Sequence, residues 1–590
     1  MDSPFGRFST SGTEYVIDAP FAPPRAQLNF LWNKSLISAV NQFGSGDGAF
    51  NNQTLTLNDP RGRVRLIRDG RRYFYVRDCD SGELWNVGLF PIRPEGASHI
   101  ARVGLGYSTF ETAHRGVTVE STVFLASDEA AELWQFAVSN RGDSPRRLWL
   151  TPYVEWLLGG YPVFSSPYSY LRSQFDPVRR AVLSFNTSDE RPHDHYHAFL
   201  ATDGEVAGWS GGRRDFLGPY GSPSAPRALL TGEMPDREAW CEELAGSLAI
   251  IVELAPGATR QIGVSLGSFD TLEAKDRIIA KTRDPDYRAA VRQRMADEKR
   301  AMIECVQVAT PSEAINRLTN VWAKQQIQLC AEFGRDGARG FRDTLQDAWA
   351  AIPFNASLAS TKIKETLAHQ YSDGHAIRGW MPIQAHHYSD GPCWIAPAVC
   401  AYLKETGDRA LLDEVVPYLD GGRASVLDHL LVGLRHLSED LGTHGLVLAH
   451  EGDWNDSLNW MGREGRGESV WTSMALFHSL GLVAEMATEL LDAPALCSEM
   501  ELRAATIRHA IQTFGWDGSW YLAGYSDDGT PVGSHRNAQG RVFLNTQTWA
   551  ILTGLATGPR LEACLAAIDN ELESTHGSLT LAPAFTEADS

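Results

Sequence analysis

The stretch TLEAKDRIIAKTRD, residues 271–284, decides the fold of this 590-residue chain, because the character of the sequence changes there. Its apolar residues recur at helical spacing, and most of its residues have high helix propensity. The next segment, DYRAAVRQRMADEKRAMIECV (286–306), has the same pattern. Together they predict a helical linker over residues 271–310, with a larger domain on each side.

The N-terminal side of this linker, residues 1–270, is predicted to be a β domain. Short runs rich in β-branched and aromatic residues, such as VTVESTVFLAS (117–127), are separated by Gly, Asp, Asn and Pro. The segments DGRR (69–72) and SNRGDSPRR (139–147) are typical of hairpin turns. Many short strands at this spacing predict a large antiparallel β-sandwich.

The C-terminal side, residues 311–590, is predicted to be helical. Candidate helices run near 311–333, 344–358, 361–371, 393–406, 408–418, 422–440, 468–491, 496–513, 544–556 and 559–572. Their pairing, with Gly- and Trp-rich loops between them, favours an (α/α)6 barrel with its pocket at the loop ends. Six helical hairpins need twelve helices and the sequence offers about ten. We therefore expect the barrel to be truncated at its C-terminal end.

Composition narrows the choice of ligand and compartment. The net charge is −20 with no basic block, which argues against nucleic acid and anionic membranes as partners and favours a neutral ligand such as a sugar. Seventeen tryptophans suit sugar rings, although most indoles fill cores. The eight cysteines form no CxxC pair, and neither a secretory signal nor a membrane-spanning apolar run is visible. We expect a cytoplasmic protein.

The acid-rich stretch EGDWNDSLN (451–459) is the first candidate for chemistry. Cleavage of a glycosidic bond needs a carboxylic acid with a raised pKa, and an apolar wall or a second carboxylate raises it. Trp454 can supply the wall, and Asp453 or Glu451 the neighbouring charge. The alternative is that Asp453 and Asp456 cap a helix or form Asx turns.

Three further motifs complete the set. In GFRDTLQD (340–347), Arg342 and Asp343 can grip vicinal hydroxyls, although Asp343 can instead be a helix N-cap. HHYSDGPCW (386–394) lacks the i, i+4 spacing and a clear third ligand, so we predict no metal site. GREGRGESVW (462–471) has a Gly-rich turn before a helix that can accept an anion, but it matches no P-loop.

Taken together, these motifs resemble those of the inverting disaccharide phosphorylases, the cellobiose and chitobiose type, including the phosphorylase-like domain of cyclic β-1,2-glucan synthases. The stretches that carry the resemblance are GFRDTLQD (340–347), YSDGPCWIAPAVCAYLKETGD (388–408), HGLVLAHEGDWNDSLNWMGREGRGESVW (444–471), GWDGSWYLAGYSDDG (515–529) and FLNTQTWAILTG (543–554). Weaker similarity begins at GTEYVIDAP (12–20), so it covers nearly the whole chain. It implies a β-sandwich, a helical linker and an (α/α)6 barrel.

The resemblance also assigns roles. It selects Asp456 as the general acid, with Trp454, Asp343, and Arg342 or Arg339 lining the pocket for the transferred sugar. Phosphate attacks C1 from the face opposite the leaving group, as the activated water does in an inverting hydrolase. The implied reaction is reversible phosphorolysis of a β-glucoside to an α-sugar 1-phosphate, by a hexosyltransferase that uses inorganic phosphate as co-substrate and no cofactor. A homodimer is also implied.

Two departures from the family pattern keep alternatives open. The family often has two aspartates where this chain has Asp390 followed by Gly391, and its members continue beyond HGSLTLAPAF (576–585) into a region that holds a phosphate-binding histidine. His576 lies too early to replace that histidine. The alternatives are an inverting glycoside hydrolase and a non-catalytic, carbohydrate-binding protein. For the linkage we expect β-1,2 or β-1,4.

Overall fold

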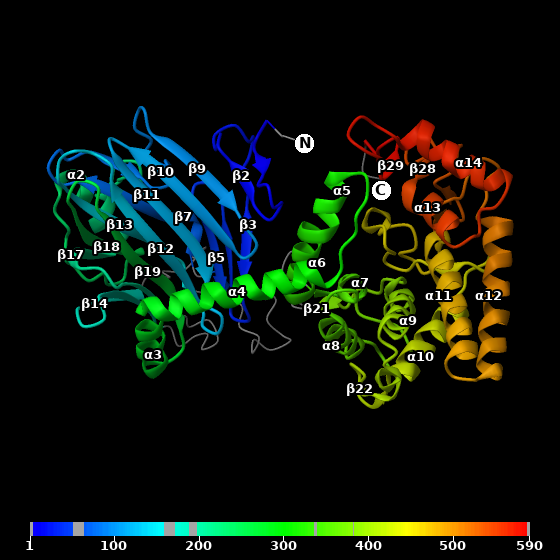
Figure 1. Ribbon diagram of the computed structural model, residues 1–590. Coiled ribbons are helices and arrows are strands. Elements are labelled where there is room, and N and C mark those ends of the chain that lie inside the picture. The colour runs from blue at the N-terminus through cyan, green and yellow to red at the C-terminus, as the bar shows by residue number, and fades with distance from the viewer. Residues whose placement is uncertain are drawn as a thin grey trace. The chain divides into compact units, whose positions relative to one another are not determined.

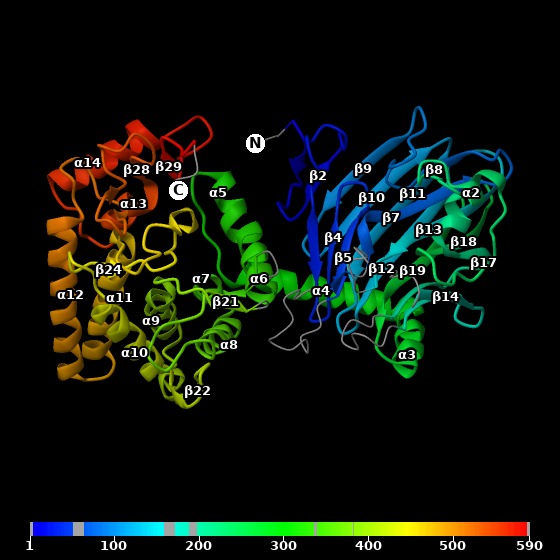
Figure 2. The ribbon, with the colours of Figure 1, turned by 180° about the vertical axis from the view of Figure 1, so that it is seen from behind.

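The computed structural model describes residues 4–50, 64–65, 67–158, 171–187, 197–335, 339–380 and 383–586 (Figures 1 and 2). The chain forms two compact units, Met1–Gln325 and Gln326–Ser590. The first unit consists mainly of β-strands, and the second consists mainly of helices.

The described residues of the N-terminal unit form three antiparallel sheets. The largest has the strand order β1 (Arg7–Phe8), β2 (Tyr15–Ile17), β9 (Ser98–Val103), β10 (Tyr107–His114), β11 (Val117–Leu125), β12 (Ala131–Asn140), β19 (Thr259–Phe269), β16 (His197–Thr202), β15 (Ala181–Asn186), β14 (Leu171–Asp176). The second is β17 (Val206–Gly212), β18 (Leu244–Leu254), β13 (Arg146–Trp156), β7 (Ile67–Asp78), β8 (Leu84–Asn86). The third is β3 (Asn29–Trp32), β4 (Leu36–Val40), β5 (Gly46–Phe50), β6 (Val64–Arg65).

The two larger sheets share one core. Along β10, buried and partly exposed residues alternate, as expected for a strand with one face on a core. Trp134 of the ten-stranded sheet is buried in the same cluster as Leu150 and Ile250 of the five-stranded sheet. The sheets therefore pack face to face, and the predicted antiparallel β-sandwich is confirmed.

The two segments predicted to be hairpin turns, DGRR and SNRGDSPRR, do not connect paired strands of one sheet. DGRR (69–72) lies inside β7, where the pairing with β13 passes from Arg72–Val154 to Ile67–Trp156. The extra residues of β7 form an irregularity that includes Gly70 at φ 65°, a conformation that glycine adopts without strain. SNRGDSPRR (139–147) joins β12 to β13, which belong to different sheets. The turn residues were recognised correctly, but sequence spacing did not show which strands they connect.

The linker stretch folds into two helices, α3 (Leu272–Arg283) and α4 (Pro285–Cys305). Thr271 caps α3 by accepting a hydrogen bond from the amide of Ala274. Asp284 ends α3 and caps α4, whose first residue is a proline, a favourable first helical residue. Ile279 of α3 is buried with Phe124 and Phe269, so α3 covers the outer face of the ten-stranded sheet. Two short helices, α1 (Arg213–Leu217) and α2 (Arg227–Thr231), also lie in this unit.

A continuous helical stretch comes next along the chain, with α5 (Glu313–Arg317), a π-helical turn (Leu318–Trp322) and α6 (Ala323–Phe333). The helices that follow are α7 (Phe341–Ala351), α8 (Ala356–Leu367), α9 (Ile395–Thr406), α10 (Val426–Glu439), α11 (Val470–Glu489), α12 (Pro494–Phe514), α13 (Leu544–Leu552) and α14 (Pro559–Ala567). Short strands join their loops: β20 (Arg339–Gly340) with β21 (Gly379–Trp380), β24 (Val447–Leu448) with β25 (Glu468–Ser469), β26 (Gly524–Tyr525) and β27 (Pro531–Val532), and β28 (Val542–Phe543) with β29 (Leu581–Ala582).

These helices pack around one apolar core. On α10, Val426, Leu430, Leu434 and Leu437 recur at helical spacing and are all buried. Helices α11 and α12 lie side by side in both views of the ribbon (Figures 1 and 2). The predicted order of β-sandwich, linker helices and helical domain is confirmed, whereas closure into six hairpins stays a prediction. In the described part of the chain, no helix is long and apolar enough to cross a membrane.

One predicted helix is wrong. Residues 408–418 contain a 3-10 helix (Arg409–Asp413) and then β22 (Val415–Pro417), which pairs with β23 (Arg423–Ser425). The β-branched pair Val415–Val416 favours a strand, and Pro417 cannot continue a helix. Gly421 and Gly422, both at positive φ, form the turn between the two strands.

Candidate active site

A cavity of about 290 Å³ brings most of the predicted site residues together. It lies where β20, β21, the first turn of α7 and the loop around Asp456 meet. Its lining is Arg335, Arg339, Gly340, Phe341, Arg342, Asp343, Ile377, Arg378, Gly379, Gln384, Tyr388, Asp390, Gly391 and Asp456. Four guanidinium groups and three carboxylates in one cavity suit a ligand with many hydroxyl groups or a negative charge.

Arg342 is the centre of the cavity's charge network. It lies in the first turn of α7 and donates hydrogen bonds to Asp456 Oδ1 at 2.7 Å and to the carbonyl oxygen of Asp453 at 2.8 Å. It also forms an ion pair with Asp390 at 3.2 Å. Burial alone would lower the pKa of Arg342, but Asp390 and Asp456 raise it above its usual range. Arg342 therefore stays charged and fixes the carboxylates around it.

Asp456, the predicted general acid, reaches into this cavity from the first residue of a short 3-10 helix (Asp456–Leu458). Its side chain is 55% exposed and pairs with Arg342 at 2.7 Å and with Arg378 at 3.5 Å. It is thus open to a ligand, while its Oδ1 atom accepts hydrogen bonds from the guanidinium groups of Arg342 and Arg378.

Asp453 lies beneath the cavity and is buried. Its Oδ2 accepts a hydrogen bond from Ser469 Oγ at 2.6 Å, and its Oδ1 accepts one from the amide of Asn455 at 2.7 Å. The second contact is the Asx turn that we considered as an alternative for this residue. Burial, together with the charge of Asp390, raises the pKa of Asp453 to about 6. Asp453 therefore holds the loop that carries Asp456.

Trp454 is placed differently from the other predicted residues. Its indole is 36% exposed and stacks on Trp471, with ring centroids 5.2 Å apart. Trp471 in turn contacts Trp394 and Trp549. Trp454 is absent from the cavity lining among the described residues, so its role as an apolar wall stays a prediction.

Arg339 and Asp343 line the cavity but have protein partners. Arg339 pairs with Glu365 at 3.3 Å and donates to the carbonyl oxygen of Glu332 at 2.7 Å. Asp343 pairs with Arg335 at 2.9 Å. Asp343 is not the N-cap of α7, because the helix already begins at Phe341. The N-cap is Gly340, where a Cβ atom would lie 2.0 Å from Asp343 Oδ2, so a larger residue there would require the Asp343 side chain to move.

Sequence reasoning missed Arg335, Arg378 and Tyr388. The guanidinium of Arg378 lies 4.8 Å from the centroid of the Tyr388 ring. A signal was present, since Arg339–Gly340 and Arg378–Gly379 are similar Arg-Gly pairs whose glycines are cross-strand partners in β20 and β21. The glycines let the two backbones approach, and the strand pairing brings both arginines to one cavity.

The Gly-rich turn in GREGRGESVW does not offer its amides to an external anion. Asp527 accepts hydrogen bonds from the amides of Glu464, Arg466 and Gly467. The N-terminus of α11 is capped by Ser469, which accepts from the amide of Thr472. Internal groups therefore fill the positions that we had considered for an anion.

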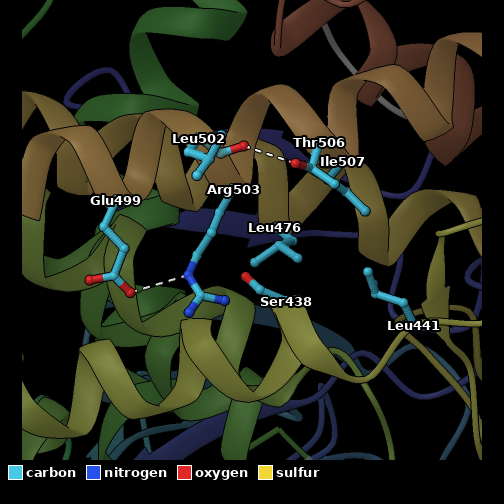
Figure 3. Close-up of a pocket in the computed structure, with 8 residues that line it drawn as sticks. All are labelled: Ser438, Leu441, Leu476, Glu499, Leu502, Arg503, Thr506 and Ile507. Atoms are coloured by element: carbon cyan, nitrogen blue, oxygen red, sulfur yellow. Dashed lines mark hydrogen bonds and ion pairs between the residues drawn. The ribbon is translucent and has the colours of Figure 1, made fainter.

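A second cavity, of about 330 Å³, lies between α10, α11 and α12 (Figure 3). Figure 3 shows Leu441, Leu476 and Ile507 around it, with Arg503 hydrogen-bonded to Glu499 on one side. None of the predicted site residues lines it. The candidate active site is therefore the cavity that contains Asp456.

Comparison with known proteins agrees with this placement. Residues 13–285 match the family described as "Glycosyl hydrolase 94, supersandwich domain", and residues 299–590 match "Glycosyl hydrolase 94 superfamily, catalytic domain". The chain belongs to the glycosyl hydrolase 94 superfamily. The catalytic-domain match includes every residue of the Asp456 cavity.

Three relatives show which reactions occur in this family. Solabiose phosphorylase of Paenibacillus borealis is 43% identical over 585 residues, which are 99% of this chain and 76% of that protein. The 3-O-beta-D-glucopyranosyl-beta-D-glucuronide phosphorylase of the same organism is 30% identical, over 99% of this chain and 75% of that protein. N,N'-diacetylchitobiose phosphorylase of Vibrio proteolyticus is 27% identical, over 99% and 77%. The predicted family is confirmed, and these relatives support disaccharide phosphorolysis rather than hydrolysis.

Proposed function

We propose that this glycosyl hydrolase 94 protein catalyses the reversible, inverting phosphorolysis of a β-glucosyl disaccharide to α-glucose 1-phosphate, as a hexosyltransferase with phosphate as its acceptor. The observation that carries the proposal is Asp456, an exposed carboxyl group at a cavity lined by Arg335, Arg339, Arg342 and Arg378. An inverting phosphorolysis needs one protein acid and groups that bind a sugar and an anion. The proposal needs no cofactor or metal in this cavity.

Asp456 donates the proton in this mechanism. Its carboxyl group protonates the bridging oxygen as the bond from that oxygen to C1 breaks. A phosphate oxygen forms the new bond to C1 from the opposite face, so the configuration inverts. In the reverse direction the carboxylate of Asp456 takes a proton from the attacking hydroxyl group of the acceptor.

The substrate has to reach Asp456 past the two arginines that contact it. Arg342 and Arg378 both contact Asp456 Oδ1, so their guanidinium groups occupy positions from which a substrate oxygen would approach this atom. Arg342 is anchored by Asp390, whereas Arg378 makes its other side-chain hydrogen bond to Gln384 and is more exposed. We propose that substrate hydroxyl groups or phosphate draw Arg378 away from Asp456 when the site is filled, which opens the carboxyl group to the bridging oxygen.

The substrate we propose is a disaccharide with a β-linked glucosyl group, and solabiose is the first to test. The support comes from relatives, since the protein 43% identical to this chain is a solabiose phosphorylase, and the one 30% identical is named for a 3-O-β-glucopyranosyl substrate. A β-1,3 linkage therefore joins the β-1,2 and β-1,4 linkages that we expected from the motifs. Asp343 and Arg339, which line the cavity, are the proposed contacts for sugar hydroxyl groups. Trp454, which does not line it, is proposed as a further sugar contact on the resemblance alone.

A cytoplasmic location and a homodimer complete the proposal. None of the eight cysteines, all of which lie in the described part of the chain, forms a disulfide bond, which fits a reducing compartment. Fractionation of the native host tests the location, and light scattering of the purified protein tests the dimer.

The experiment runs the reaction in the synthetic direction. Purified protein is incubated with α-glucose 1-phosphate and one acceptor at a time, chosen from galactose, glucose, N-acetylglucosamine and glucuronic acid, and phosphate release is followed. Solabiose, laminaribiose, cellobiose and sophorose are then tested with phosphate in the opposite direction. Release that requires one acceptor supports the proposal. Cleavage without phosphate would indicate a hydrolase, and sugar binding without turnover would indicate a binding protein.

Asp456→Asn is the decisive variant, because asparagine has nearly the same shape and no proton to give. Loss of a positioned acid lowers the rate by about 10²–10⁴-fold. Asp569→Asn is the matched control, since Asp569 is exposed and does not line the cavity. If Asp456→Asn keeps more than about a tenth of the activity of the control, Asp456 is not the acid.

A further inference from the structure

A cluster of histidines and carboxylates lies outside the Asp456 cavity, in the same helical unit. One nitrogen of His387, one nitrogen of His436 and one carboxylate oxygen of Asp440 lie within 4.8 Å of one another. None of the three residues lines the cavity. The proposed reaction therefore leaves this cluster unexplained.

Two of the three groups come from one helix end. His436 lies in the last turn of α10, and Asp440 is the C-cap of that helix. Residues four apart lie on the same helix face, so their side chains can reach one ion. The partial negative charge of a helix C-terminus also favours a cation. Sequence reasoning considered His386 and His387 with the nearby Asp390 and missed this i, i+4 pair, which lies about fifty residues further along.

One ring nitrogen in this cluster could act as a metal ligand and makes no hydrogen bond to the described residues. His436 Nε2 is buried and has no hydrogen-bond partner among the described residues. A buried imidazole nitrogen without a partner is uncommon and calls for an explanation, such as an ion. The rings of His387 and His450 stack 4.0 Å apart, and the His375 ring lies 5.1 Å from that of His387. Imidazole rings this close together repel one another when each carries a proton, whereas they can share one cation as its ligands.

The groups around the three residues resemble the outer shell of a metal site. His450 Nε2 and Asp440 Oδ2 are hydrogen-bonded at 2.6 Å, an arrangement that orients the carboxylate. An imidazole ring has a nitrogen electron pair that a metal ion can accept.

We propose that His387, His436 and Asp440 bind a divalent transition-metal ion of the zinc class. Two imidazole nitrogens and one carboxylate oxygen are ligands that such ions accept, and water or His375 completes the tetrahedron. Bond lengths of about 2.0–2.2 Å bring ligand atoms closer together than 4.8 Å, so binding draws the three side chains inward.

The proposed ion would fix the loop of the general acid. Two hydrogen bonds join His387 to Glu451. The amide of Glu451 donates to the carbonyl oxygen of His387 at 3.1 Å, and the amide of His387 donates to the side-chain Oε2 of Glu451 at 2.7 Å. The amide of Ser389 donates to the carbonyl oxygen of Gly452 at 3.0 Å. The segment after Gly452 carries Asp453 and Asp456. A metal ion at His387 therefore ties the end of α10 to this loop, and its role is structural.

The test is direct metal binding by the whole purified chain. The protein is stripped with a chelator and titrated with Co²⁺, whose visible absorption reports tetrahedral nitrogen and oxygen ligands, and Zn²⁺ binding is measured by equilibrium dialysis. We expect one equivalent of Co²⁺ that Zn²⁺ displaces, and a rise in Tm of about 5 °C or more when free Zn²⁺ exceeds its Kd by 100-fold.

Matched variants locate the site. His387→Gln, His436→Gln and Asp440→Asn should each weaken Zn²⁺ binding by at least about 10-fold. Asp440→Asn keeps a hydrogen-bond acceptor for His450, so a loss of binding in this variant is not explained by a folding defect. His509→Gln, an exposed histidine on α12, should bind as the unchanged protein does. The proposal is wrong if the chain binds no stoichiometric Co²⁺ or Zn²⁺. It is also wrong if the three cluster variants bind as tightly as His509→Gln does.

Discussion

Replacing Arg342 by methionine tests whether the charge network of the cavity is built as described. The side chains of Arg342 and Asp390 are only 12% and 2% exposed, so the substitution leaves a buried carboxylate without its cation. Breaking a buried ion pair on one side costs about 3–5 kcal/mol of unfolding free energy. At about 2–4 °C per kcal/mol, Tm should fall by about 6–20 °C. Scanning calorimetry of the whole chain measures this for the transition that contains the helical unit.

Arg378→Met is the matched control, because it removes the same group from the same cavity. Arg378 and Asp456 are 35% and 55% exposed and lie 3.5 Å apart, so water replaces the lost partner and the loss should stay below about 1 kcal/mol. In the background of Asp390→Asn, which removes the buried charge, Arg342→Met should cost at least about 2 kcal/mol less than it does alone. Equal losses for Arg342→Met and Arg378→Met would refute the reasoning.

Three further predictions concern the loop and the helical core. The pKa of Asp453 is about 6 in the folded chain against 3.8 as its ordinary value, so the folded state binds a proton that the unfolded state releases, and stability falls as pH rises from about 4 to about 6. Asp453→Asn removes this pH dependence, so its unfolding free energy should rise by about 2 kcal/mol relative to that of the unchanged chain between pH 4 and pH 7. An equal difference between the two proteins at both pH values in urea titrations would contradict this. Ser469→Ala loses a helix cap and the hydrogen bond to Asp453, so it should lower the free energy of unfolding by about 2 kcal/mol in urea titrations. Ser425→Ala loses only a cap at the exposed start of α10 and should lower it by about 1 kcal/mol. Leu434→Ala, in the core, should lower the free energy of unfolding by about 2–5 kcal/mol. Leu502→Ala, whose side chain is 71% exposed, should lower it by less than about 0.5 kcal/mol, and calorimetry should show the difference in Tm.

Local patterns predicted most of the elements. The alternation along β10 and the helical spacing in 271–306 repeat over a few residues, so the sequence shows them directly. The prediction failed at 408–418, where a short apolar run fits a helix and a hairpin equally well, and in DGRR, where glycine marks an irregularity inside a strand. In both places the pairing with another strand decides, with β23 directly after the first segment and with the distant β13 for DGRR.

What the sequence by itself determined is the order of β-sandwich, linker helices and helical domain, and the motif that contains Asp456. Only the tertiary structure decided which groups meet around that acid. Arg342 lies 48 residues from Asp390 and 114 residues from Asp456, and His387 and His436 also meet across the chain. The physical reason is that helix and strand periods act over one or two turns, whereas the meeting of distant side chains depends on how whole helices and loops pack around the core.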